Sequence, residues 1–158
     1  MKIIESKSIK ACGLSVEITK SHSENFSIIS KHWQFFNREL NRNKIKLPVD
    51  WIKYGITFRK NEGLFYMCAI PEMPDTSFQS MLISHGYYCQ FQHVGAINFL
   101  KSTINDIYKN LLPINYIELD TKMELVHYER YDNRFHWSRK DSIIDILIPI
   151  IKPKNFQK

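Results

Sequence analysis

The stretch MELVHYERYD, residues 123–132, carries the pattern on which our prediction of fold and function depends. We expect a β-strand here, and alternate side chains of a strand lie on the same face of its sheet. Leu125, His127, Glu129 and Tyr131 would therefore share one face. Two interpretations of the mid-strand carboxylate remain open. Glu129 either faces solvent or pairs with Lys or Arg, since carboxylates are rarely buried unpaired, or it is a lone carboxylate in an aromatic-lined cavity. Such a cavity would attract a cationic or hydrogen-bond-donating ligand, with cation–π contacts assisting.

Outward from this stretch, the chain reads as alternating strands and helices. Apolar residues at steps of three and four between Phe26 and Leu40 indicate a helix that ends before Pro48. A similar stripe within residues 95–111 indicates a second helix, with Pro113 at the expected stop. Segments of β-branched, apolar or alternating residues predict strands over residues 2–19, 53–59, 64–71, 80–93, 123–131 and 142–150. Gly13, inside the first of these strands, indicates a bulge or a close backbone approach.

The order strand, helix, strand, strand occurs twice, roughly over residues 1–71 and 80–150, with a loop over 72–79. We therefore predict the α+β class, with an antiparallel sheet built from two similar halves. A groove between two such halves is a natural place for a ligand.

Composition narrows the class of protein further. The chain has 158 residues, 44% of them hydrophobic and 13% aromatic, which excludes a disordered chain. The net charge is +6, but Lys and Arg are dispersed, so a solvated basic surface is a simpler interpretation than nucleic-acid binding. Cys12, Cys68 and Cys89 have no metal-ligand spacing and read as small buried hydrophobes. With no signal peptide or membrane-spanning stretch, we expect a cytoplasmic protein that does not contact membranes.

Several segments, in order along the chain, carry a family resemblance. Tyr128–Asp132 resembles the Phe/Tyr-Glu-x-Tyr signature of the GyrI-like effector-binding domains, the ligand-binding modules of bacterial AraC- and MerR-type drug-responsive regulators. The other matching segments are Ala11–Val16, His32–Phe36, Tyr54–Ile56, Gly86–Gly95, Ile107–Pro113 and Ile144–Ile150. Two positions depart from the pattern: Leu111 stands where a Trp is usual, and Asp145 stands where a Glu is usual.

The resemblance covers about residues 2–150. It implies two strand–helix–strand–strand units related by a pseudo-twofold axis, with the ligand pocket between them. We accordingly expect one effector-binding domain over residues 1–151 and a basic, disordered tail over 152–158. Because the sequence starts directly at the first strand, we expect a stand-alone member that does not bind DNA itself.

The resemblance also implies candidate ligand-binding residues. Glu129 matches the family's pocket glutamate, which interacts with bound cations, and Tyr131 shares its strand face. Trp33 matches a tryptophan of the first helix, although core packing explains it equally well. Tyr88 matches a family tyrosine and is a weaker candidate.

Three further residues are candidates by position. Tyr66 and Phe65 lie on opposite faces of one strand, and we expect Tyr66 to line the groove. Trp137 follows the signature on a loop, where it either covers the pocket or is simply exposed. His127 shares the face of Glu129 and could tune its charge, although a structural histidine is the more common case.

Three functions remain open. The first is binding of a small molecule, such as a lipophilic cation or an aromatic drug-like compound, by the Glu129 pocket. The second is hydrolysis of electrophilic compounds, with Glu129 as general base and Tyr131 orienting it. The third is a protein-interaction module with a partner such as DNA gyrase, because the family takes its name from a gyrase inhibitor. No motif predicts a cofactor or a metal.

Overall fold

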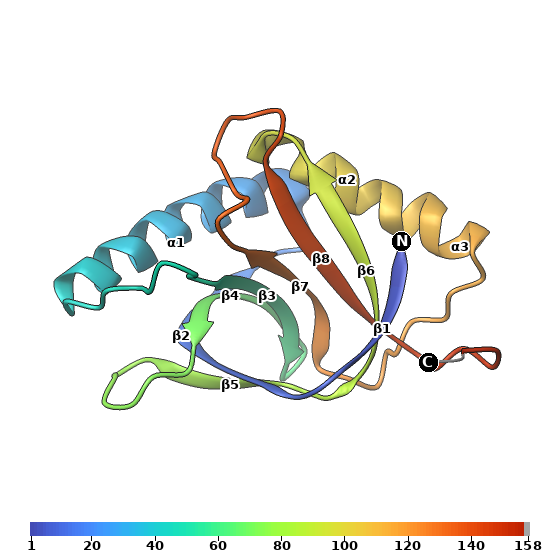
Figure 1. The fold of residues 1–158 in the computed structure, drawn as a ribbon, viewed down its shortest axis with the longest axis horizontal. Helices are drawn as coiled ribbons and strands as arrows, with labels where there is room; N and C mark the ends of the chain where they lie inside the picture. Colours follow the sequence, from blue (N-terminus) through green and yellow to red (C-terminus); the bar gives the residue numbers. More distant parts are fainter. Residues whose placement is uncertain (157–158) are drawn as a thin grey trace.

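The computed structural model describes residues 1–156 and forms one antiparallel sheet with two helices (Figure 1). Its elements are β1 (Lys2–Ser6), β2 (Ile9–Ile18), α1 (His22–Arg42), β3 (Lys53–Lys60), β4 (Gly63–Pro71), β5 (Gln79–Ile83), β6 (Gly86–Val94), a 3-10 turn η1 (Ile97–Phe99), α2 (Leu100–Asp106), a π-helical segment η2 (Ile107–Leu111), α3 (Leu112–Ile114), β7 (Leu125–Tyr131) and β8 (Ile143–Ile150). The predicted α+β class is confirmed.

The strand order shows the two-halved plan directly. The eight strands lie in the order β1-β6-β8-β7-β3-β4-β2-β5. Outward from the central pair, one half reads β3-β4-β2 and the other β7-β8-β6, so the halves correspond strand for strand. The predicted first strand is in fact two strands, and β1 pairs with β6 of the other half while β5 pairs with β2. The two halves thus exchange their outermost strands, which ties them into one sheet.

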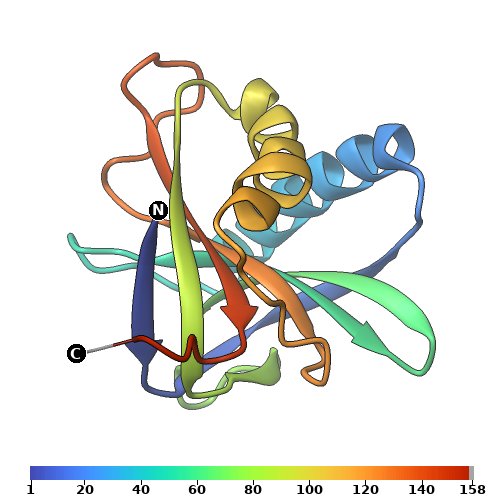
Figure 2. The ribbon, with the colours of Figure 1, turned by 90° about the vertical axis from the view of Figure 1, so that its right-hand side faces the viewer.

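Both helices cover the same side of the curled sheet (Figure 2). One cluster of buried residues joins α1 to β2 and β4, and it includes Phe36, Leu40 and Ile70. A second joins the other helix to β6 and β8 and includes Ile107 and Ile146. A third cluster, formed by residues such as Ile56, Tyr88 and Tyr128, fills the remainder of the interior. Packed core residues therefore lie on either side of the space between the two helices.

The second helix differs from the prediction at its end. It continues to Ile114, three residues past the expected end at Leu111, and Pro113 lies inside it. Pro113 lies in the last turn of this continuous helix, with only Ile114 after it. The turn before it is π-helical, a local widening that is often found at functional sites.

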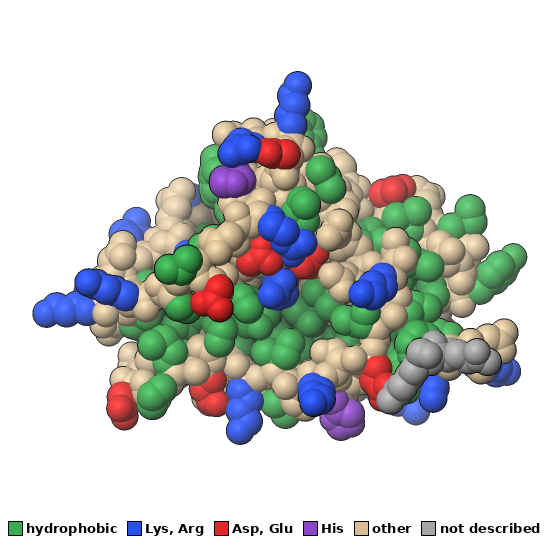
Figure 3. All heavy atoms as spheres, in the orientation of Figure 1, with side chains coloured by type: hydrophobic (Ala, Val, Ile, Leu, Met, Phe, Trp, Pro, Cys, Tyr) green, Lys and Arg blue, Asp and Glu red, His purple; other side chains and the backbone are tan. Residues whose placement is uncertain are grey.

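The predicted dispersed basic charge and the predicted tail can be compared with the structure. On the face drawn in Figure 3, Lys and Arg side chains are scattered and form no stripe. Of the predicted tail, Gln157 and Lys158 lie outside the described residues. Its described part contacts Tyr87: the Lys152 Nζ lies 5.3 Å from the ring centroid, and the Phe156 ring packs edge-on at 5.5 Å. Among residues 1–156, no helix combines the length and the apolar composition needed to cross a membrane.

The close backbone approach predicted at Gly13 is present and gives a test of the fold. A Cβ on Gly13 would lie 1.9 Å from the Cys68 carbonyl oxygen in β4. We expect Gly13→Ala to lower the free energy of unfolding by about 2–3 kcal/mol, because the paired backbones would have to separate. Ser15→Ala on the same strand is the control, since Ser15 is partly exposed. Equal urea midpoints for the two variants would contradict this account.

Candidate functional site

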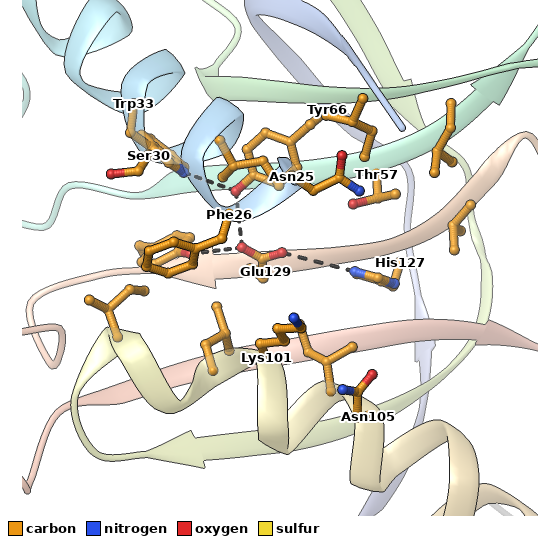
Figure 4. A pocket seen from close by; sticks show the side chains of 18 of the residues that line it. Asn25, Phe26, Ser30, Trp33, Thr57, Tyr66, Lys101, Asn105, His127 and Glu129 are labelled. Carbon is orange, nitrogen blue, oxygen red and sulfur yellow. Dashed lines mark hydrogen bonds and ion pairs between the residues drawn. The ribbon is translucent and has the colours of Figure 1, made fainter. Parts of the chain in front are cut away.

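A cavity with a volume of about 960 Å³ lies between α1, the second helix and the sheet. Its walls come from both halves of the chain. One face of α1, the facing side of the second helix, and residues of β3, β4 and β7 surround it. Figure 4 shows side chains from α1 and the sheet converging on Glu129, with Lys101 and Asn105 entering from the opposite helix. The predicted groove between the halves is therefore present, and Glu129 lies at its base.

Glu129 is buried, with 4% of its surface exposed. Its Oε1 atom accepts two hydrogen bonds, from the Tyr131 hydroxyl at 2.7 Å and the Tyr66 hydroxyl at 3.0 Å. The Trp33 Nε1–H in turn donates to the Tyr66 oxygen at 2.9 Å. These bonds hold the carboxyl in one orientation (Figure 4). With Oε1 occupied, Oε2 is the carboxyl oxygen that remains for a ligand.

The local sequence explains how this cluster assembles. Glu129 and Tyr131 are two residues apart on β7, so they share a face, as predicted. Directly across the central strand pair, Glu129 is in register with Gly55 of β3. A Cβ at Gly55 would lie 2.0 Å from the Tyr66 hydroxyl and 2.9 Å from the Glu129 Oε1. Gly55 is therefore part of the site, because its missing side chain is the space in which the Tyr66 hydroxyl meets the carboxyl.

Burial changes the acid–base behaviour of the site. It raises the pKa of Glu129 to about 7, and the hydrogen bonds from Tyr131 and Tyr66 hold that pKa down against the burial effect. Burial and, to a smaller extent, the positive charge of Arg59 together lower the pKa of His127 to about 4. The two groups approach each other, with Nε2 of His127 4.0 Å from Oε2 of Glu129. Near neutral pH the imidazole is uncharged, so this contact is not an ion pair.

His127 is held by a residue that the sequence analysis did not single out. The Tyr108 hydroxyl lies 2.9 Å from the His127 Nδ1, and Tyr108 belongs to the π-helical segment η2. The cross-strand neighbour of His127 is Thr57, and both line the cavity. When the Tyr108 hydroxyl donates to Nδ1, the ring proton resides on Nε2 and points toward the cavity. The available signal was the position of Tyr108 four residues after Ile104 in the predicted helix, which fits a core position equally well.

Aromatic rings surround the open side of the carboxyl. Trp33 packs edge-on against Tyr131 with a centroid distance of 5.3 Å, and Phe135 packs edge-on against Tyr131 at 5.1 Å. Trp137 also lines the cavity, and 63% of its surface is exposed. That it covers the pocket stays a prediction. Its carbonyl accepts a hydrogen bond from the Ile97 N–H at 3.3 Å, which fixes the loop against the second helix.

The loop carrying Phe135 and Trp137 is held by an ionic cluster. Arg134 donates to both carboxylate oxygens of Asp132 at 2.9 Å and also bonds Asp145, a buried residue of β8. Arg130 donates to Asp132 at 2.9 Å as well. Ionic contacts to charged residues of the sheet thus hold the loop that carries Phe135 and Trp137.

The structure brings together five of the six predicted site residues: Glu129, Tyr131, Tyr66, Trp33 and Trp137 line one cavity. Tyr88 lies elsewhere. It is fully buried, its hydroxyl donates to the Ser84 carbonyl at 2.6 Å, and its ring packs on Tyr128 in a separate core cluster. In the described part of the chain, no group of three or more His, Cys, Asp or Glu residues is placed to hold a metal ion.

The fold and the two-halved plan are those expected for an effector-binding domain, and the family comparison agrees. The chain belongs to the Cass2 family of integron-associated effector-binding proteins, whose model matches residues 2–150. No protein of curated function matches it.

Solved structures with the same fold share little sequence with this chain. SAV2435 bound to tetraphenylphosphonium has a TM-score of 0.74 at 12% identity, over 95% of this chain and 93% of its own. A Staphylococcus aureus MU50 protein assigned to transcription regulation has 0.71 at 14%, over 96% and 97%. The Vibrio cholerae integron cassette protein VCH_CASS2 has 0.63 at 15%, over 95% of both chains.

The hydrogen bonds to Oε1 of Glu129 affect its pKa, and this effect can be tested. Because the Tyr131 hydroxyl stabilises the carboxylate, Tyr131→Phe should raise the pKa of Glu129 further above about 7. Carbon-13 NMR of the labelled Glu side chains measures this, with Glu129→Gln assigning the signal. Tyr88→Phe is the matched control and should leave the midpoint in place. A Tyr131→Phe midpoint equal to or below that of the wild type would show that this bond does not tune Glu129.

Proposed function

We propose that the protein binds an aromatic or lipophilic organic cation, with the positive group against Oε2 of Glu129. The observation that carries the proposal is a buried carboxyl whose one oxygen is bound by two tyrosines while the other remains for a ligand. Glu129 lines a cavity of ligand size. A buried carboxylate with no countercharge costs free energy, so this group does not stabilise the fold. We therefore interpret it as a group that binds a ligand.

The energetic argument follows from that cost. Without ligand, burial favours the protonated, neutral carboxyl. A cation that enters the cavity supplies the missing countercharge and makes the ionised form favourable. The rings of Trp33, Tyr131 and Phe135 supply further attraction, since each cation–π contact contributes roughly 0.5–2 kcal/mol. The known complex of SAV2435 with tetraphenylphosphonium supports this class of ligand for a domain of the same fold.

Tetraphenylphosphonium is the first probe. At 100 times its Kd, it should stabilise the wild type by about 2.7 kcal/mol in a thermal-shift assay. Glu129→Gln should lose most of this shift, because the variant keeps the shape and loses the charge. Glu62→Gln removes the other carboxylate of the cavity lining and should keep the shift. Triphenylphosphine oxide, a neutral analogue, should stabilise neither form.

The same binding should depend on pH in a defined direction. Below about pH 7 Glu129 is protonated in the free protein, so binding of a cation must release a proton. The Kd should therefore rise by up to about tenfold for each pH unit below 7 and level off above it. Calorimetry in buffers of different ionisation heat detects the released proton. Binding of the cation with equal affinity by wild type and Glu129→Gln at pH 8 would refute the proposal.

The other functions that the resemblance implies remain predictions. These are the link to transcription regulation, action without a DNA-binding partner domain, interaction with DNA gyrase, and hydrolysis with Glu129 as general base.

A further inference from the structure

The cavity lining holds more basic than acidic side chains. Five basic side chains line it, against two carboxylates, Glu62 and Glu129. The basic residues are Lys20, Lys53, Arg59, Lys101 and Lys109. An organic cation approaching Glu129 would meet net repulsion at the mouth of the cavity. A ligand that suits the whole cavity must therefore also carry something that these basic groups bind.

Three of the five basic residues gather at one end of the cavity. Ile18, at the end of β2, is in register with Leu64, and Leu64 is in register with Arg59, so Lys20 and Arg59 leave the same end of the sheet. Lys109 follows Tyr108, whose hydroxyl bonds His127, and His127 pairs with Thr57, two residues from Arg59. We call Lys20, Arg59 and Lys109 the basic end.

The basic end is electrostatically unsatisfied. All three side chains are exposed, and among residues 1–156 none of them has a carboxylate oxygen within 4.0 Å. Lys53, at the opposite end beside Tyr131, is different. Its Nζ donates to Asn37 Oδ1 at 3.0 Å and lies 5.5 Å from the Trp51 ring centroid. Only Glu62 contributes negative charge to the lining near the basic end, and it is exposed.

The distance between the two ends suits one ligand. Glu129 is level with Gly55 on β3, and Arg59 is four residues farther along the same strand. A rise of about 3.3 Å per residue separates the two positions by roughly 13 Å. The Arg59 side chain covers part of this distance. Between the ends, polar side chains of Thr57, His127 and Asn105 line the cavity (Figure 4).

We propose that the cavity selects amphoteric ligands, in which an aromatic cation at Glu129 carries a carboxylate that the basic end of Lys20, Arg59 and Lys109 binds. The cationic half of this inference rests on the proposed function, and the anionic half adds a second subsite. The basic end then serves two purposes: it repels compounds that carry positive charge alone, and it attracts those with an acidic arm.

A matched pair of probes tests the second subsite. (4-Carboxybutyl)triphenylphosphonium has the aromatic cation and a four-carbon arm ending in a carboxylate, and its methyl ester has the same cation with a neutral arm. Calorimetry at pH 8 and low salt should give a Kd about tenfold lower for the acid. The preference should shrink as salt is added, because the basic end is exposed to solvent.

The variant Arg59→Gln/Lys109→Gln should abolish the preference for the acid while the ester binds at least as tightly as before. Lys31→Gln/Lys122→Gln makes the same change in net charge outside the cavity and should keep the preference. Glu129→Gln should weaken both probes.

The outcomes separate this inference from the proposed function. If the ester and tetraphenylphosphonium bind in a Glu129-dependent way but the acid has no advantage, or if the double variant at the basic end keeps the advantage, the second subsite is refuted and the cation site stands. If no phosphonium compound binds in a Glu129-dependent way, the proposed function fails, and this inference fails with it.

Discussion

The hydrogen bonds from Tyr66 and Tyr131 to a single oxygen of Glu129 are the interaction on which the site depends. They orient the carboxyl, leave its second oxygen for the cavity, and moderate the rise in pKa that burial causes. The fold makes this possible at its centre. β3 and β7 pair there, and the glycine opposite Glu129 leaves the volume that the Tyr66 hydroxyl needs. One half of the molecule thus supplies the charge and the other supplies the space and a donor.

The cavity that results has two chemically different ends. Rings from α1, β7 and the following loop surround the carboxyl, and an ionic cluster around Arg134 and Asp145 supports them. The opposite end is open and basic. In our proposal this difference between the ends acts on selectivity more than on affinity, because exposed charges contribute little binding energy individually, while like charges disfavour the wrong ligand.

Periodicity was sufficient to predict much of this arrangement. Alternation on the 123–131 strand placed Glu129 and Tyr131 on one face. On the 64–71 strand it showed only that Tyr66 and Phe65 face opposite ways, and the choice of Tyr66 for the groove did not follow from periodicity. The helical stripe between Phe26 and Leu40 placed the first helix correctly. What periodicity could not give was which distant segments pair. The exchange of β1 and β5 between halves, and the register that sets Gly55 against Glu129, depend on contacts far apart in the chain. Tyr88 illustrates the same limit, because the resemblance identified the residue while the sheet turns its side chain into a separate core cluster.

The most direct test of the account is the pKa of the Glu129 carboxyl itself, followed by carbon-13 NMR with and without saturating tetraphenylphosphonium. The account predicts a midpoint of about 7 in the free protein and a midpoint at least one pH unit lower in the complex, since the bound cation stabilises the carboxylate. A midpoint near the ordinary value of 4.5 in the free protein, or the same midpoint in both states, would contradict it.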